Sequence, residues 1–301
     1  MILCLVDDDP VALEALTFAR RFGEVEALVF GDVDVRGYVN RARRVVHERL
    51  DGYAAEAWAQ AVVELEPALV VAPGTDRGHE VLAHVAARVG APLAANVVDA
   101  RADGDALWLT RQRWGGSLLE EARLVGTPKL LSVAPHAVDA EAAGLETTVG
   151  TFTPTLGDEH FRVRVTRREE PAAGTVRLDT ARVVVGGGRG VGSKEGFELL
   201  EELAGLLGGA VGGSRVVTNL GWRPHSDQVG QTGARIAPDL YIACGVSGAI
   251  QHIVGCKGAK RILVINKDQN APIVARADWA VIGDLHEIVP AIVAELRKNG
   301  G

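Results

Sequence analysis

Short apolar runs alternate along the chain with segments in which apolar residues recur at the spacing of an α-helix. Residues 2–6, for example, read as a strand, and Asp9 and Pro10 after them favour the start of a helix. Further strands are expected at 26–30, 68–72, 107–110, 129–133, 181–185, 240–244, 261–265 and 280–282, and further helices over 54–65, 78–89 and 195–207 and from Leu285, with a new start at Pro290. Apolar strands that alternate with helices predict mostly parallel sheets flanked by helices, the α/β fold class.

The alternation is interrupted at residues 166–174, where charged residues, a proline and a glycine are typical of a surface linker. The chain has 301 residues, which exceeds the usual size of a single hydrophobic core. We therefore expect two α/β domains, residues 1–170 and residues 176–301.

The composition is that of an ordinary globular protein, with 47% hydrophobic and 24% charged residues. A formal net charge of −7 argues against a nucleic-acid-binding protein. The three cysteines form no C-x-x-C pair and the histidines of the first domain lack metal-ligand spacing, so neither a disulfide framework nor a metal site is expected. No apolar stretch approaches ~18 residues and residues 1–6 lack the features of a signal peptide, so we expect no membrane span and a cytoplasmic location.

Each strand of the second domain is expected to end in a polar or glycine-rich loop, at residues 186–192, 212–215, 245–248, 266–268 and 283–284. The carboxyl ends of parallel strands share one edge of the sheet, which is where α/β proteins bind ligands. Polar residues that no simple core requirement explains crowd into residues 228–252: Gln228, Gln231, Thr232, Ser247, Gln251 and His252. Arg189 and Arg215 follow two of the loops and suit an anionic ligand. The sequence therefore predicts a bound cofactor at this edge.

Two alternative functions stay open at this point. Residues 186–190 look like a dinucleotide fingerprint, but no frame gives G-x-G-x-x-G, which weakens the case for an NAD-dependent Rossmann oxidoreductase. Residues 245–249 lie one residue from the G-x-S-x-G elbow of a serine hydrolase, in which Ser247 would be the nucleophile. Asp268 and His286 follow in the order of such a triad, but the chain lacks a His-Gly-Gly-Gly-like oxyanion loop.

The second domain resembles the α subunit of electron transfer flavoprotein across roughly the last third or more of the chain. The motifs that carry the resemblance occur in the family's order and spacing: Gly187-Gly188-Arg189-Gly190, Gly213-Ser214-Arg215, Gln228-Val229-Gly230-Gln231-Thr232-Gly233, Leu240-Tyr241-Ile242-Ala243, Ser247-Gly248-Ala249-Ile250-Gln251-His252, Ile265-Asn266-Lys267-Asp268, Ala271-Pro272-Ile273 and Gly283-Asp284-Leu285. Gly186 departs from the pattern, since a serine is common there. The first domain resembles the family only loosely.

The resemblance implies a Rossmann-like, doubly wound second domain that binds one FAD. Arg215 is then expected over the isoalloxazine ring, Thr232 near N5 and His252 at the N1/O2 edge. Ser247, Gly248 and the helix start after them are expected to hold the phosphates. The residues expected to contact FAD are Arg189, Ser214, Arg215, Val229, Gly230, Gln231, Thr232, Ser247, Gly248, Ala249, Ile250, Gln251, His252, Asn266, Asp284 and Leu285.

The resemblance further implies an electron carrier without substrate turnover and without catalytic residues of its own. A β subunit is expected as the partner in a heterodimer. Electrons are expected to come from flavin dehydrogenases of the acyl-CoA dehydrogenase type, as in fatty acid β-oxidation, and to pass singly to a quinone oxidoreductase.

Overall fold

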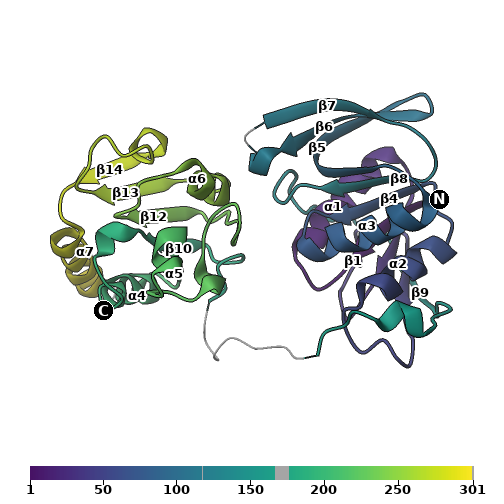
Figure 1. Cartoon of the computed structure of the whole chain (residues 1–301), viewed down its shortest axis with the longest axis horizontal. Helices are drawn as coiled ribbons and strands as arrows, with labels where there is room; N and C mark the ends of the chain where they lie inside the picture. The colour runs from purple at the N-terminus through teal and green to yellow at the C-terminus, as the bar shows by residue number, and fades with distance from the viewer. Residues whose placement is uncertain (117, 167–175, 300–301) are drawn as a thin grey trace. The chain divides into compact units, whose positions relative to one another are not determined.

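The computed structural model describes residues 1–116, 118–166 and 176–299. The chain divides into two compact units, Met1–Glu169 and Glu170–Gly301, and each is described by itself (Figure 1). The predicted linker at residues 166–174 lies outside the described residues except for Thr166.

The first unit is built on one nine-stranded sheet in the order β7-β6-β5-β8-β4-β1-β2-β3-β9. Neighbouring strands are parallel except for the pairs β5–β6 and β6–β7, which are antiparallel. The strands are β1 (Ile2–Val6), β2 (Val25–Val29), β3 (Arg41–Val45), β4 (Leu69–Pro73), β5 (Leu93–Asp103), β6 (Ala106–Arg113), β7 (Leu118–Leu124), β8 (Lys129–Val133) and β9 (Thr148–Phe152).

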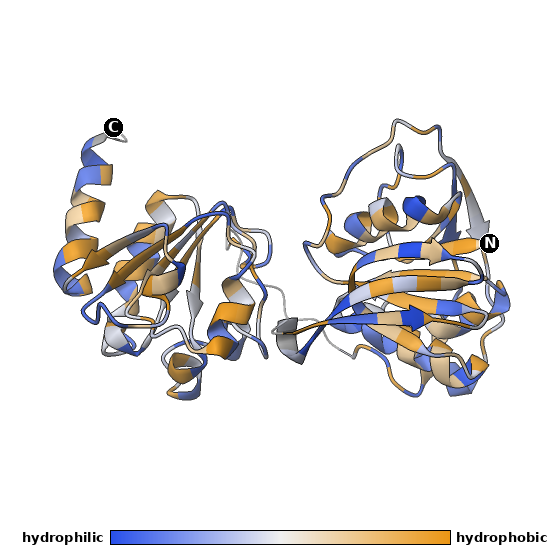
Figure 2. Cartoon of the chain, turned by 90° about the horizontal axis from the view of Figure 1, so that it is seen from above, coloured by the Kyte–Doolittle hydropathy of each residue, from blue (hydrophilic) through white to orange (hydrophobic). Residues whose placement is uncertain are grey.

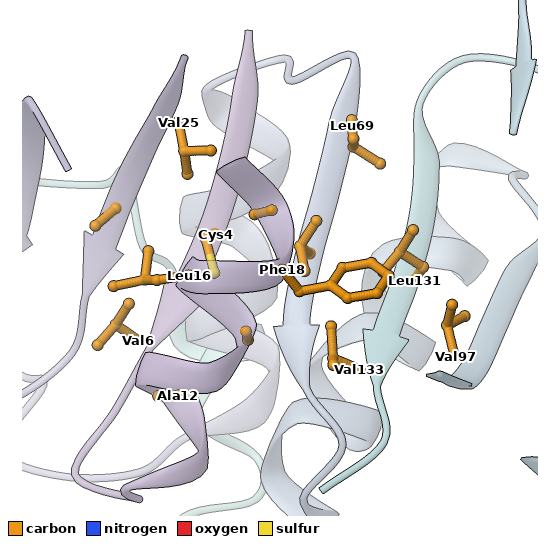
Figure 3. Close-up of a cluster of buried hydrophobic side chains, with 14 of the residues drawn as sticks. Cys4, Val6, Ala12, Leu16, Phe18, Val25, Leu69, Val97, Leu131 and Val133 are labelled. Atoms are coloured by element: carbon orange, nitrogen blue, oxygen red, sulfur yellow. The ribbon is translucent and has the colours of Figure 1, made fainter. Parts of the chain in front are cut away.

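Three helices cover this sheet: α1 (Val11–Ala19), α2 (Ala55–Glu64) and α3 (Asp76–Val89). A carboxylate oxygen of Asp9 accepts a hydrogen bond from the Val11 N–H, which stabilises the start of α1. Buried residues of α1 pack on one face of the sheet, and buried residues of α2 and α3 pack on the other. In Figure 3, Leu16 and Phe18 of α1 lie over Cys4 and Leu131 of the strands beneath.

The second unit has one five-stranded sheet, all parallel, in the order β11-β10-β12-β13-β14. Its strands are β10 (Val183–Gly187), β11 (Ala210–Gly213), β12 (Leu240–Cys244), β13 (Ile262–Asn266) and β14 (Trp279–Ile282), and its α-helices are α4 (Phe197–Leu206), α5 (Arg215–Asn219), α6 (Ile250–Cys256) and α7 (Leu285–Asn299). Apolar residues concentrate in the strands (Figure 2), with α4 and α7 packed on one face and α6 on the other. The predicted α/β fold with two mostly parallel sheets is confirmed.

Several details of the prediction were wrong. The strand expected at 181–185 is Val183–Gly187, and β3, β5, β7 and β9 were not predicted, whereas β11 was predicted only through the loop expected at its end, residues 212–215. Strand β3 was missed because its arginines are not typical of a strand inside a sheet. In the structure, Arg43 and Arg44 form ion pairs with Glu26 and Asp32. The helix α7 also runs through Pro290 without a new start, because its neighbour Val289 is buried in the core and holds that turn in place.

No helix in the described part of the chain has the length and apolarity needed to cross a membrane.

Candidate functional site

The strand order of the second unit reverses between β10 and β12, since the chain moves from β10 to β11 on one side and then to β12 on the other. The loops that follow β10 and β12 touch directly at this switch point. The Gly188 N–H donates to the Cys244 carbonyl at 2.9 Å, and the Gly190 N–H donates to the Gly245 carbonyl at 3.1 Å. A Cβ atom on Gly190 would lie 2.7 Å from Cα of Gly245, so the two backbones meet where no side chain fits. A crevice at such a point is the usual ligand site of open α/β sheets.

The loop of residues 228–234 joins the edge of the sheet beside β11. The Val229 N–H donates to the Gly213 carbonyl at 2.8 Å. The side chain of Gln228 is buried, accepts a hydrogen bond from the Thr218 hydroxyl at 2.9 Å, and donates one to the Thr232 hydroxyl at 2.9 Å. Gln228 therefore ties the loop to α5 and orients the side chain of Thr232, which is exposed in this loop.

The same loop packs against α6. The Gln231 N–H donates to the Gln251 carbonyl at 2.7 Å. A Cβ atom on Gly255 would lie 2.3 Å from the backbone nitrogen of Gly230, so only glycine allows this approach. These contacts bring residues 229–232 next to Gln251 and His252.

His252 is buried beneath this loop. Its Nε2 atom lies 2.7 Å from the hydroxyl of Tyr241, which is fully buried. Its Nδ1 atom is also buried, and it forms no side-chain hydrogen bond with the described residues. Burial lowers the pKa of His252 to about 4, while a contact with the Val229 backbone acts weakly in the opposite direction. The imidazole is therefore neutral at physiological pH.

The rim of the site carries exposed positive charge. Arg189 follows β10 and Arg215 begins α5 after β11, and both are exposed. Among the described residues, neither arginine has a carboxylate partner. Asp284, which follows β14, is paired with Lys267 at 2.8 Å, and this contact together with the His286 N–H holds the pKa of Asp284 below its ordinary value.

Asn266, at the end of β13, forms hydrogen bonds within the loops of the candidate site. Its amide Nδ2 donates to the Val246 carbonyl at 2.8 Å, and its Oδ1 accepts from the Asp268 N–H at 3.1 Å. The side chain therefore fixes the loop after β12 relative to the loop after β13.

Comparison with known proteins matches both units to one family. Residues 177–257 match the family model described as the electron transfer flavoprotein FAD-binding domain, and residues 7–155 match the electron transfer flavoprotein domain. The chain is 32% identical over 308 residues to electron transfer flavoprotein subunit alpha of Thermoanaerobacterium thermosaccharolyticum, across 96% of this chain and 93% of that protein. It is 38% identical over 305 residues to the subunit of the same name from Mycobacterium tuberculosis, across 97% and 95% of the two chains. This chain belongs to the electron transfer flavoprotein alpha-subunit family.

The family assignment confirms the resemblance and the cofactor, which is FAD. It also extends to the first unit, where the sequence motifs resembled the family only loosely. A third relative, Protein FixB of Clostridium saccharobutylicum, is 33% identical across 96% of this chain and 92% of its own length.

The sixteen residues predicted to contact FAD all lie in or directly beside the loops at the carboxyl ends of the five strands. They differ in exposure. Val229, Gly230, Gly248, His252 and Leu285 are buried; Ser214, Asn266 and Asp284 are half-buried; and Arg189, Arg215, Gln231, Thr232, Ser247, Ala249, Ile250 and Gln251 are exposed. Their individual contacts to the cofactor stay predictions.

The chemistry of this edge fits FAD. A pyrophosphate needs cations and hydrogen-bond donors, and Arg189, Arg215 and the exposed Ser247 hydroxyl offer them. Gly188 and Gly190 let the loop after β10 pack directly on Gly245 of the loop after β12, which brings the two loops together at this edge.

The alternative functions are not supported. In the described part of the chain, no hydrogen bond joins Ser247 to His286 or His286 to Asp268, as a hydrolase triad requires. The family that matches is FAD-binding, which leaves an NAD-dependent oxidoreductase without support. No cluster of metal-ligating side chains occurs among the described residues.

Sequence reasoning did not assign roles to Gln228 and Tyr241 at the level of contacts. Tyr241 carried a usable signal, because it is the one residue with a hydroxyl in the apolar run Leu240–Cys244. A buried tyrosine hydroxyl needs a partner, and His252 was already a candidate on the next helix.

Proposed function

We propose that this chain is the FAD-carrying subunit of a heterodimeric electron carrier and pairs with a β subunit. FAD is held at the carboxyl edge of the sheet β10–β14, between the loops after β10, β11 and β12. Electrons come from flavin dehydrogenases of the acyl-CoA dehydrogenase type and pass singly to a quinone oxidoreductase. The chain itself converts no substrate.

The observation that carries this proposal is the direct backbone contact of the loops after β10 and β12. Arg189 and Arg215, which have no carboxylate partner in the part of the chain that the structure describes, follow β10 and β11 at the same edge of the sheet. The contact fixes bare backbone at the switch point, and Arg189 and Arg215 supply positive charge there. The names of the relatives, which are alpha subunits, support a heterodimer with a second kind of subunit.

When bound, FAD supplies the one-electron chemistry, and the residues of the chain tune it. Two unit charges ~4 Å apart interact by ~4 kcal/mol at an effective dielectric constant of 20. Since ~1.4 kcal/mol corresponds to about 59 mV for one electron, an adjacent arginine raises the reduction potential by at most ~170 mV. Arg215 is the residue that the proposal assigns to this role.

The test is the Arg215→Ala variant in the complex with the co-purified partner subunit, with the reduction potential of FAD measured by anaerobic titration. The potential is expected to fall. Arg182→Ala is a matched control, because Arg182 precedes β10 at the opposite edge of the sheet, where it pairs with Asp239. An unchanged potential in Arg215→Ala would reject the role of Arg215. A wild-type complex that retains no FAD would reject the function.

A second measurement addresses the donors. Wild-type complex is mixed with an acyl-CoA dehydrogenase and its acyl-CoA, and bleaching of the FAD absorbance is followed. Bleaching that requires both additions supports the proposed donor class, and its absence, in a complex that a chemical reductant does bleach, contradicts it.

A further inference from the structure

A buried hydrogen bond links the sheet to the candidate FAD site. Tyr241 lies in β12 with no exposed surface, and its hydroxyl contacts Nε2 of His252 in α6. Tyr241 belongs to a buried cluster that includes Val184, Ala243 and Val264, and the polar groups nearest to it besides His252 are the buried thiols of Cys256 and Cys244. The tyrosine ring lies over Gly186, where a Cβ atom would be 2.2 Å from the hydroxyl oxygen.

The direction of this hydrogen bond follows from the surroundings. The Tyr241 hydroxyl has one proton, and Nε2 of His252 is the one partner that the described residues offer it. If Nε2 were protonated and donated to the oxygen, the hydroxyl proton would be left buried without an acceptor, which costs about 1–3 kcal/mol. The hydroxyl therefore donates and Nε2 accepts.

The accepting role of Nε2 decides which nitrogen of His252 is protonated. A neutral imidazole has one N–H, and the partner of one nitrogen determines the tautomer. Because Nε2 accepts from Tyr241, the proton of His252 resides on Nδ1. That atom lies by the backbone of Val229, at the start of the loop of residues 229–232, without a hydrogen bond of ordinary geometry.

We propose that Tyr241 is a positioning residue that fixes His252 as a neutral hydrogen-bond donor, with its N–H on Nδ1, at the loop of residues 229–232. This inference rests on the proposed function, which places FAD beside that loop. An N–H directed there favours the backbone carbonyl of Val229 and so holds the loop in the position from which it would contact the cofactor, whereas the lone pair of the other tautomer would repel that carbonyl. Tyr241 thus acts on FAD through His252 and need not touch the cofactor.

The tautomer is measured directly in the full-length chain before FAD is added. The imidazoles are labelled with ¹⁵N, and a long-range ¹H–¹⁵N spectrum at neutral pH distinguishes protonated from unprotonated ring nitrogens. The chain has eight histidines, and His252 is assigned by its loss in His252→Gln. A protonated Nδ1 and an unprotonated Nε2 are expected. A protonated Nε2 in the wild-type chain would overturn the inference.

The variant Tyr241→Phe then tests the role of the hydroxyl. We expect the Nε2–H tautomer to gain population and FAD affinity to fall on the order of tenfold, the equivalent of about one hydrogen bond. Tyr38→Phe, a matched change outside the candidate site in the first unit, is expected to alter neither. A Tyr241→Phe chain that keeps the wild-type tautomer and affinity would show that Tyr241 does not set the state of His252.

The two readouts separate this inference from the proposed function. FAD binding by the wild-type chain and its partner tests the function. The His252 spectrum tests the inference in the absence of FAD. A chain with the expected tautomer that binds no FAD would reject the function alone.

Discussion

Acidification should destabilise the second unit through His252 before most carboxylates titrate. An ordinary histidine has a pKa of 6.5, and burial lowers that of His252 to about 4. Between these values the unfolded chain takes up a proton that the folded chain excludes, so stability falls as the pH is lowered. The full difference corresponds to about 3 kcal/mol, of which about 2 kcal/mol is lost between about pH 7 and about pH 5.

The perturbation is His252→Gln, because glutamine is neutral at every pH and can still accept a hydrogen bond from Tyr241. The free energy of unfolding is measured in urea at both pH values, with pulsed amide exchange of peptides from β12 to report on the second unit. Wild type is expected to lose about 2 kcal/mol more than the variant on acidification. Equal losses in the two proteins would refute the conclusion that burial keeps His252 neutral.

His136 in the first unit provides an internal control of opposite sign. Its hydrogen bond to Glu14 raises its pKa, so its stabilising effect is present below the ordinary histidine pKa and is lost as the pH rises through the raised value. His136→Gln is therefore expected to cost more stability at about pH 5 than at about pH 7.

Three further changes probe the loops of the candidate site. Gly190→Ala should destabilise the second unit by about 1–3 kcal/mol in thermal unfolding and impair FAD retention, because its Cβ would lie 2.7 Å from Cα of Gly245. Gly205→Ala, whose Cβ would meet open space, is the control. Gln228→Ala should cost about 1–3 kcal/mol by removing the two hydrogen bonds that tie the loop to α5 and to Thr232, and should speed proteolysis within residues 228–234. Ser247→Ala should leave ester hydrolysis at background in both proteins, whereas an esterase activity abolished by the change would favour a hydrolase.

The sequence predicted those elements whose pattern of apolar and polar side chains matches their burial in the folded chain. Strands such as Leu240–Cys244 are apolar throughout, because helices cover both faces of a parallel sheet. The strand Arg41–Val45 was missed, because its arginines are neutralised by residues distant in the sequence, such as Glu26, and that pairing exists only after folding. The reading of Pro290 as a restart failed for a related reason, since core packing outweighed the local preference of proline.

Most of the candidate site could be located from the sequence because its loops follow strands, and parallel strands bring their carboxyl ends to one edge. The loop of residues 228–234 follows α5 instead, and its crowded polar residues indicated it. The contacts inside the site could not be predicted from the sequence. The bonds of Gln228 to two threonines, and of Tyr241 to His252, depend on how α5 and α6 pack against the sheet. A polar residue in an apolar strand indicates that a partner exists, without indicating which one.

The contact between Gly190 and Gly245 has a consequence for biosynthesis. The two glycines come from strands that are adjacent in space, but β11 and its flanking helices are translated between them. A fragment of the second unit that ends before β12 therefore lacks one side of this contact. With FAD bound where we propose, a nascent chain that ends before β12 would lack part of the site, and the cofactor would load only after β12 has emerged and docked beside β10. Flavin incorporation therefore reports completion of the centre of this sheet.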